Sequence, residues 1–332
     1  MRGISGSGRA IPRRLGLMAG LAAPFMARRA DAQQPSLVEI GVQGWLFPTW
    51  DRIHRVDLAA VRSTLQSVTA AIEVLRAARI QVVICLIPSK KRIMSQFLPP
   101  GTTVAPEAAQ RYSLTVQEAT RVGALVPDLE ALFRAQIQRD PARHLFFKSD
   151  THWTPFGSEV AAVEMARQMR AGLQLPQSPR PGTRLGDLRT MTLAAGDLVQ
   201  HIPAAQRASF GAEESLIRQI LPPEGAAALI EDDSHDTVIV GTSNVQPRFG
   251  FQPVLSNQLV RPVGLTWRPN NVGTYFALLE YVRSEGFRRQ RPRALVWNHL
   301  EQDMLSSPGN PAWGTAAMAP AEFLNQLRRA VA

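Results

Sequence analysis

Thr237–Val245 reads TVIVGTSNV, and this segment determines which fold we expect. Its first five residues are mostly β-branched and apolar, which is typical of a strand covered by helices on both faces. Ser243 follows on the turn, where open α/β sheets place their reactive groups. Two further apolar runs, Gln81–Ile87 (QVVICLI) and Ala294–Trp297 (ALVW), predict neighbouring strands of the same kind.

Helical periodicity fills the intervals between these runs. Residues Leu58, Val61, Leu65, Val68, Ile72 and Leu75 recur at helical spacing behind Asp57, a good N-cap. We expect further helices at about 106–122, 128–138, 154–170, 250–260 and 272–285. Prolines interrupt residues 172–236, which we predict to be an irregular insertion. Strands that alternate with helices predict an α/β fold with a mostly parallel central sheet.

Composition narrows the class of protein. The chain has 332 residues, 45% of them hydrophobic and 19% charged, so we expect a globular fold. The single cysteine, Cys85, excludes an intrachain disulfide framework and a Cys-based zinc ribbon. No nucleotide-binding glycine pattern and no metal-ligand spacing is recognisable, so we expect no cofactor and no metal. The basic residues do not cluster with interleaved aromatics, which argues against a nucleic-acid partner.

The first 32 residues have the pattern of an export signal. Arg13-Arg14 precedes an apolar stretch, Leu15–Met26, and Ala30-Asp31-Ala32 offers a small-x-small cleavage site. The arginine pair favours the twin-arginine route over an ordinary secretory signal or an uncleaved anchor. Six arginines and one acid in this segment account for half of the net charge of +10. We therefore expect a signal over 1–32, cleavage near Ala32, and a single mature domain over 33–332 in the periplasm.

A second segment contains residues that could take part in catalysis. It is Asp150-Thr151-His152-Trp153-Thr154-Pro155. Thr154 and Pro155 are good N-cap and N1 residues, so Asp150 and His152 lie on the loop before a helix. Histidine is the natural general base near neutral pH. The alternative is a capping loop in which both side chains only bond to the backbone. With Ser243, the two residues supply a complete nucleophile, base and orienter.

Six further residues are candidates for binding substrate or the oxyanion. A tetrahedral intermediate needs hydrogen-bond donors beside the nucleophile, and an exposed aromatic ring or a lysine can contact a sugar. The six candidates are Thr242, Asn244, Asn270, Asn271, Trp153 and Lys90. Core packing is the alternative for Trp153, and a solvated surface position is the alternative for Lys90.

Together these segments resemble the alginate O-acetyltransferase AlgX/AlgJ-like family. G-x-x-G-W-L-F at 41–47, Ile87-Pro88-Ser89-Lys90, D-T-H-W-T-P and the G-T-S turn occur in the family's order. The tail differs, because Trp297–Gln302 reads WNHLEQ where the family has W-E-x-P-E-R. The resemblance implies an SGNH-hydrolase-like three-layer α/β/α fold and assigns Asp150, His152 and Ser243 to a catalytic triad.

The resemblance also implies an activity and partners. It implies acetyl transfer through an acetyl-serine to hydroxyls of an exported polysaccharide. Expected partners are that polysaccharide, a membrane-bound O-acyltransferase as acetyl donor, and other exopolysaccharide export proteins. The alternatives are an acetylesterase with the same triad, or a non-catalytic carbohydrate-binding or scaffold subunit of an export complex.

Overall fold

A four-stranded parallel sheet forms the centre of the computed structural model, which describes residues 36–224 and 235–332. The strand order is β3-β8-β6-β7, and the central strands are in register, with Val296 opposite both Val83 and Ile239. The strands are β3 (Gln81–Ile87), β8 (Ala294–Leu300), β6 (Thr237–Gly241) and β7 (Gly264–Trp267). The three strands predicted from apolar runs are therefore present and adjacent.

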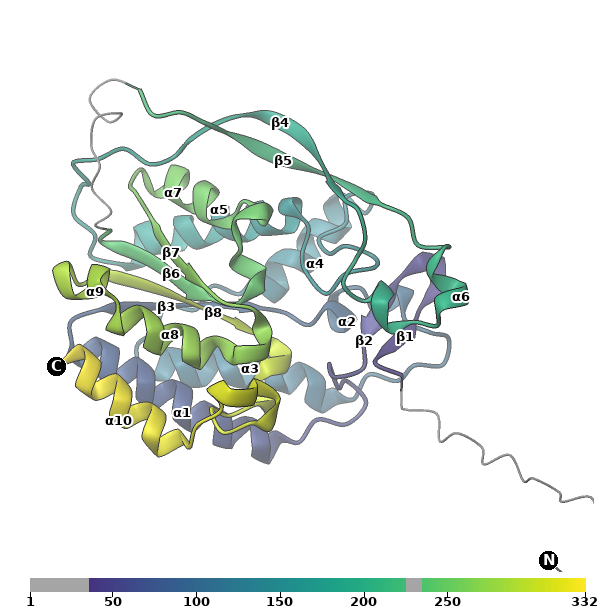
Figure 1. Cartoon of the computed structure of the whole chain (residues 1–332), viewed down its shortest axis with the longest axis horizontal. Coiled ribbons are helices and arrows are strands. Elements are labelled where there is room, and N and C mark those ends of the chain that lie inside the picture. Colours follow the sequence, from purple (N-terminus) through teal and green to yellow (C-terminus); the bar gives the residue numbers. More distant parts are fainter. Residues whose placement is uncertain (1–35, 225–234) are drawn as a thin grey trace, which may run out of the picture. The chain divides into compact units, whose positions relative to one another are not determined.

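Helices cover both faces of this sheet (Figure 1). One layer contains α1 (Leu58–Ala77), α3 (Pro106–Arg121), α8 (Gly273–Arg283) and α10 (Pro320–Val331). The other contains α4 (Leu129–Arg139), α5 (Pro155–Gly172) and α7 (Phe251–Leu259). Short helices occur at α2 (Lys90–Ile93), α6 (Ala204–Arg207) and α9 (Glu285–Arg289). This arrangement confirms the predicted three-layer α/β/α class.

Residues 172–236 differ from the irregular insertion that the prolines predicted. They contain a long antiparallel hairpin of β4 (Arg184–Leu193) and β5 (Glu213–Leu221), which passes over α5 and α7 (Figure 1). Most of its side chains are exposed or half-buried on both faces of the ribbon. Because neither face is buried, the strands lack the apolar alternation by which strands are recognised in sequence.

A second hairpin lies at the start of the described chain. It pairs β1 (Val38–Ile40) with β2 (Leu46–Pro48), and it buries Trp45 and Phe47 in the main core. The carboxyl ends of the parallel strands point toward this hairpin and α2 (Figure 1). This edge of the sheet is where an α/β fold places its site.

The export signal expected over residues 1–32 lies outside the described residues. Within the described ranges, the helices are too short or too polar for any of them to cross a bilayer.

Candidate active site

Ser243, His152 and Asp150 meet at the carboxyl edge of the sheet. The His152 Nε2 atom lies 2.8 Å from the Ser243 Oγ, and its Nδ1 atom lies 2.6 Å from Asp150 Oδ1. Ser243 opens the turn that follows β6, and the other two residues lie on the loop that precedes α5. A hydroxyl, an imidazole and a carboxylate joined in this order can deprotonate the hydroxyl and stabilise the resulting imidazolium.

Packing forces the turn after β6 close to the neighbouring strand. Gly241 lies against Asn298 of β8, and a Cβ at this position would come within 2.6 Å of the Asn298 Cβ. Glycine is therefore required on steric grounds at the end of this strand. The chain then turns at Thr242, which is buried, and leaves Ser243 half-buried at the carboxyl edge of the sheet.

The loop with Asp150 and His152 is anchored at its helix end. Thr154 caps α5 as the sequence predicted: its Oγ1 accepts a hydrogen bond from Gly157 N and donates one to His144 O. The ring of Phe249 packs against His152 at a centroid distance of 5.1 Å. These contacts fix the direction of the imidazole, which positioning for catalysis requires.

Two carboxylates from the insertion fix the start of this loop. Glu213, the first residue of β5, accepts hydrogen bonds from Lys148 N and from both the amide and the hydroxyl of Ser149. Asp197 accepts from the amide and the hydroxyl of Thr151. Its own amide donates to Asp150 Oδ2 at 2.9 Å. The insertion therefore completes the surroundings of the triad.

The pKa values of the neighbouring carboxyl groups of Asp150 and Asp197 are shifted in opposite directions. Burial disfavours the charge of Asp150, but the hydrogen bonds and charge of His152 and the Asp197 amide outweigh it and lower its pKa to about 2. Burial and the charge of Asp150 raise the pKa of Asp197. Asp150 is thus the carboxylate that pairs with the imidazole, and Asp197 binds backbone beside it.

Lys90 was predicted to contact a sugar, but its position in the structure rules this out. Its side chain is buried, and the ammonium group donates to the backbone carbonyls of Leu46, Lys148 and Asp150 at 2.7, 3.0 and 2.8 Å. All three of its protons are used in these bonds. Burial lowers the pKa of Lys90 to about 7, against the opposing effect of nearby carboxylates. Lys90 joins β2 to the triad loop.

Trp153 is the second candidate whose role is corrected. Its ring is fully buried, stacks on Phe251 at 5.4 Å, and donates its indole N–H to Asn244 O. A fully buried ring cannot stack on a sugar. Through its hydrogen bond to Asn244 O, Trp153 instead supports the turn that carries Ser243.

The triad opens into a cavity of about 510 Å³. Asn244, Asn270 and Asn271 line it, as the prediction of substrate or oxyanion contacts requires. Thr242 does not line it. The Asn244 side chain is nearly buried, and its Oδ1 has no hydrogen-bond partner among the described residues. The lining also includes Trp50, Asp197, Gln200, Arg248 and Gln302, which no sequence pattern indicated as site residues.

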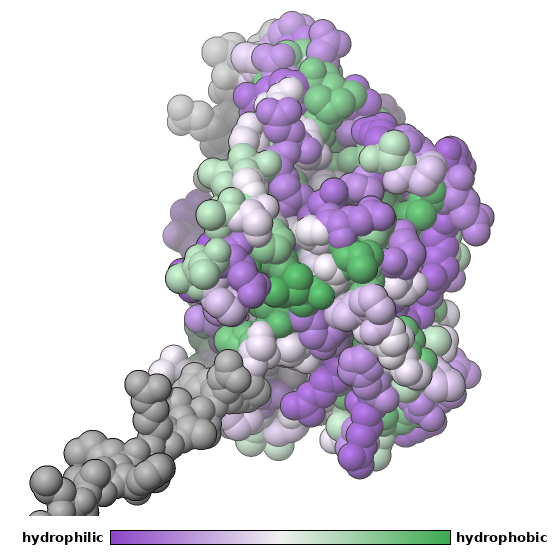
Figure 2. All heavy atoms as spheres, turned by 90° about the vertical axis from the view of Figure 1, so that its right-hand side faces the viewer, coloured by the Kyte–Doolittle hydropathy of each residue, from purple (hydrophilic) through white to green (hydrophobic). Residues whose placement is uncertain are grey.

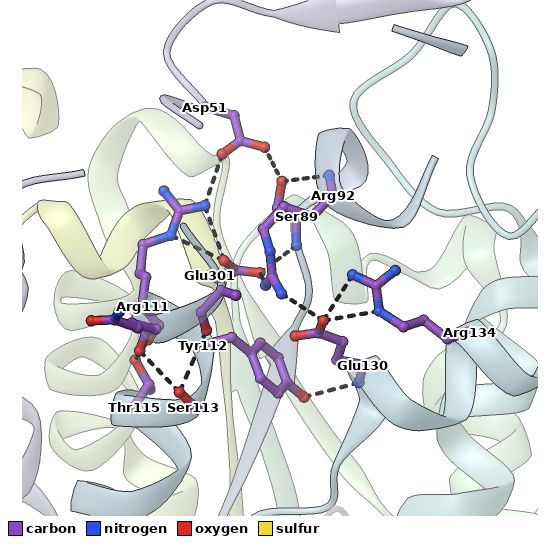
Figure 3. A network of polar contacts seen from close by, with 12 residues as sticks. Asp51, Ser89, Arg92, Arg111, Tyr112, Ser113, Thr115, Glu130, Arg134 and Glu301 are labelled. Atoms are coloured by element: carbon purple, nitrogen blue, oxygen red, sulfur yellow. Dashed lines mark hydrogen bonds and ion pairs between the residues drawn. The ribbon is translucent and has the colours of Figure 1, made fainter. Parts of the chain in front are cut away.

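Figure 3 shows a buried polar network that includes the sequence neighbours of two cavity-lining residues. Glu301, at the end of β8, accepts hydrogen bonds from Ser89 N, Arg92 and Arg111. Asp51 accepts from Arg111 and from the Ser89 hydroxyl. The network fixes the positions of residues 51 and 301, whose neighbours Trp50 and Gln302 line the cavity. No motif in the sequence joined these distant residues.

Asp150, His152 and Asp197 also form the one group of metal-ligand types found together in the described ranges. Their oxygen atoms already accept hydrogen bonds from the imidazole, from backbone amides and from Thr151. This pattern of bonds suits a triad with a supporting carboxylate.

The family model and the similar proteins all point to AlgX and AlgJ. Residues 38–301 match the family model of the SGNH hydrolase-like domain of the acetyltransferase AlgX. The probable alginate O-acetylase AlgJ of Pseudomonas putida is 27% identical over 286 residues, which cover 80% of this chain and 69% of that protein. The alginate biosynthesis protein AlgX of the same organism is 25% identical over 280 residues, which cover 80% of this chain and 56% of that protein.

Two solved structures share the fold. The O-acetyltransferase domain of Pseudomonas putida AlgJ superposes with a TM-score of 0.69 at 21% identity, covering 88% of this chain and 98% of that one. Pseudomonas aeruginosa AlgX superposes with a TM-score of 0.60 at 20% identity, covering 81% of this chain and 65% of that one. The chain spans little more than half the length of the AlgX relative that it matches in sequence. Because the family model covers most of the chain, the chain belongs to the family of SGNH hydrolase-like acetyltransferase domains described for AlgX.

Proposed function

We propose that the protein transfers acetyl groups to hydroxyls of an exported polysaccharide through an acetyl-Ser243 intermediate. The observation that carries the proposal is the chain of contacts from Ser243 Oγ to His152 Nε2 and from His152 Nδ1 to Asp150, beside an open cavity. The family adds support, since two of its relatives are named an alginate O-acetylase and an alginate biosynthesis protein.

The reaction takes two steps with one proton shuttle. His152 Nε2 accepts the Ser243 proton while Oγ attacks the acetyl carbonyl, and the donor alcohol leaves with that proton. An acceptor hydroxyl then gives its proton to His152 and attacks acetyl-Ser243, whose Oγ regains the proton as the ester bond breaks. Asp150 stays ionised and stabilises the imidazolium in both steps.

The oxyanion of each tetrahedral intermediate needs preorganised donors. We assign this role to the Asn244 and Asn271 amides, which line the cavity with Ser243. Asn270 is less suited, because its side chain is hydrogen-bonded to Asp303. Losing one oxyanion donor typically lowers kcat by about 10²–10³.

The place of action is proposed from the expected leader, and the acetyl source from the family resemblance. We place the mature protein in the periplasm, with a membrane-bound O-acyltransferase as its donor. The acceptor would reach Ser243 as part of a polymer handled by other export proteins.

The direct test is intact mass after incubation with an aryl acetate. Full-length wild type is expected to gain the mass of one acetyl group, and Ser243→Ala to gain none while turnover falls by about 10³-fold or more. Ser113→Ala, an exposed serine on α3, is the matched control and should behave as wild type.

The products separate the alternatives. Acetylated oligosaccharide assigns a transferase, and acetate without acetylated oligosaccharide assigns an esterase. If folded wild type and Ser243→Ala both stay at background, covalent catalysis is wrong and a binding or scaffold role replaces it.

A further inference from the structure

A second cavity adjoins the one beside the triad. It has a volume of about 1220 Å³ and shares four lining residues with the first: Trp50, Asn270, Asn271 and Gln302. It continues past the end of β8 to the start of α1 and to Trp313. Small-molecule sites typically measure about 300–1,000 Å³. The two cavities together form a groove, which we call the acceptor groove, with room for a chain of sugars.

Uncharged amides make up a large part of the polar lining of this acceptor groove. Gln200 lies at the triad end and Asn310 at the far end, and three of the four shared residues are amides. An amide side chain both donates and accepts hydrogen bonds. Sugar hydroxyls do the same, so such a lining matches a ligand whose polar groups are hydroxyls.

The charged residues of the acceptor groove give it no positive excess. Its cationic lining residues are Arg52, Arg55 and Arg248, and its carboxyl groups are Asp57, Glu107, Asp197 and Asp303. None of the protein's three lysines, at 90, 91 and 148, lines either cavity. A polyuronate carries one carboxylate per sugar, and its recognition calls for arginines or lysines in excess. The chain as a whole is basic, so its basic excess lies outside this groove.

Trp50 offers the acceptor groove a platform for a sugar ring. Its side chain is 43% exposed, whereas Trp313 on the opposite stretch is nearly buried. Asp51, the next residue, is fully buried and bonded to Arg111 and Ser89, which fixes the backbone beneath Trp50. The side of the molecule toward which the strands point is largely hydrophilic with separate apolar patches (Figure 2). An apolar ring among polar groups suits the CH face and the hydroxyls of a pyranose.

We propose that the acceptor groove selects a neutral, hydroxyl-rich glycan and discriminates against polyuronates such as alginate. This inference rests on the proposed transferase function and specifies its acceptor. The carboxylates of a uronate chain would meet Asp57 and Glu107 as well as Arg52 and Arg55, so the lining offers them no excess of cations. Like charges placed opposite each other lower affinity and reject the wrong partner.

The test compares two acceptors that differ only at C6 and adds a third, neutral acceptor. Full-length protein is incubated with an aryl acetate as acetyl donor and with one acceptor at a time. The acceptors are β-1,4-linked mannohexaose, the β-1,4-linked mannuronate hexamer and, as a second neutral acceptor, a β-1,4-linked glucose hexamer. Mass spectrometry counts the acetyl groups on each. We expect at least one neutral hexamer to be acetylated about tenfold faster than the uronate. Its rate should not change with salt, because no ion pairs contribute.

A tryptophan variant tests the location. Trp50→Ala should lower the ratio of neutral-acceptor transfer to aryl acetate hydrolysis about tenfold, equal to about 1.4 kcal/mol of lost stacking. Val163→Ser, an exposed position on α5 outside the acceptor groove, should leave that ratio unchanged.

The outcomes separate the two proposals. Equal or faster transfer to the mannuronate hexamer overturns the neutral-acceptor assignment and leaves the transferase intact. Acetyl-Ser243 formation without transfer to either neutral hexamer also overturns it. An unchanged ratio in Trp50→Ala removes the acceptor groove as the binding site. Absence of acetyl-Ser243 refutes the transferase mechanism itself.

Discussion

At the scale of residues, both ring nitrogens of His152 have side-chain partners, which fix the orientation of the imidazole. Asp150 receives its Nδ1–H and stays ionised, because its pKa lies near 2. The Ser243 hydroxyl occupies the other ring nitrogen. The proposed base therefore contacts both the hydroxyl and the carboxylate that the mechanism needs before any substrate arrives.

Asp150→Asn tests this arrangement in two ways. The variant should lose about 10⁴-fold in kcat, because an amide favours the wrong imidazole tautomer. The lowered pKa of Asp150 gives the folded state a stability that is present above about pH 4 and is lost as the pH falls toward 2. Urea unfolding at pH 7, 4 and 2 should therefore show a smaller acid-side loss in the variant.

The control for that experiment is Asp187→Asn on the exposed face of β4, which should match wild type in rate and in acid stability. An Asp150→Asn enzyme that keeps its rate within tenfold would contradict the assigned role.

At the scale of elements, α3 carries two arginines in opposite environments. Arg111 is fully buried and joins Asp51 to Glu301, whereas Arg121 forms an exposed pair with Glu118 on its own helix. Removing one partner of a buried ion network leaves uncompensated charges, but an exposed pair contributes little.

We expect Arg111→Met to lower the free energy of unfolding by about 3–5 kcal/mol. Arg121→Met should lower it by no more than about 0.5 kcal/mol. Chemical denaturation of both variants measures the difference. Similar losses in the two variants would show that the buried network does not hold α3 against the end of β8.

Elements with a strong local pattern were predictable from the sequence, and elements defined by distant contacts were not. The apolar run of β3 and the Asp57 cap of α1 were visible directly, because burial and capping leave local signatures. The β4–β5 hairpin left none, since both of its faces stay partly exposed.

The same contrast holds for the site. The turn after β6 and the loop before α5 carry motifs, so Ser243 and His152 were found together with Asp150. Asp197 and Glu213 hold the loop mainly through hydrogen bonds that involve backbone amides, which no residue pattern encodes. Lys90 was identified, but its burial depends on chain segments about 40 and 60 residues away.

At the scale of the whole molecule, three separate parts of the chain hold the triad loop. Lys90 reaches it from the start of α2, Glu213 from the hairpin, and Asp197 from the segment between β4 and β5. The insertion is therefore part of the machinery of the site, although it lies outside the sheet.

Hydrogen exchange on a Glu213→Ala variant tests this role. The Lys148 and Ser149 amides lose their acceptor, so their exchange should accelerate by about tenfold or more. A tenfold acceleration corresponds to about 1.4 kcal/mol of lost local stability. Amides of β3 and β8 should keep wild-type protection. Glu214→Ala, the neighbouring exposed position, is the control. Uniform acceleration across the sheet would instead indicate global destabilisation.

The placement of these contacts along the chain also sets the order in which the site is completed. When His152 has been synthesised, Lys90 is already present, but Asp197, Glu213 and Ser243 are still to come. A growing chain thus carries an imidazole without its nucleophile and without two of its restraints. The three triad residues can meet only after the chain has been synthesised past Ser243, so the proposed acetyl chemistry cannot begin on a shorter chain.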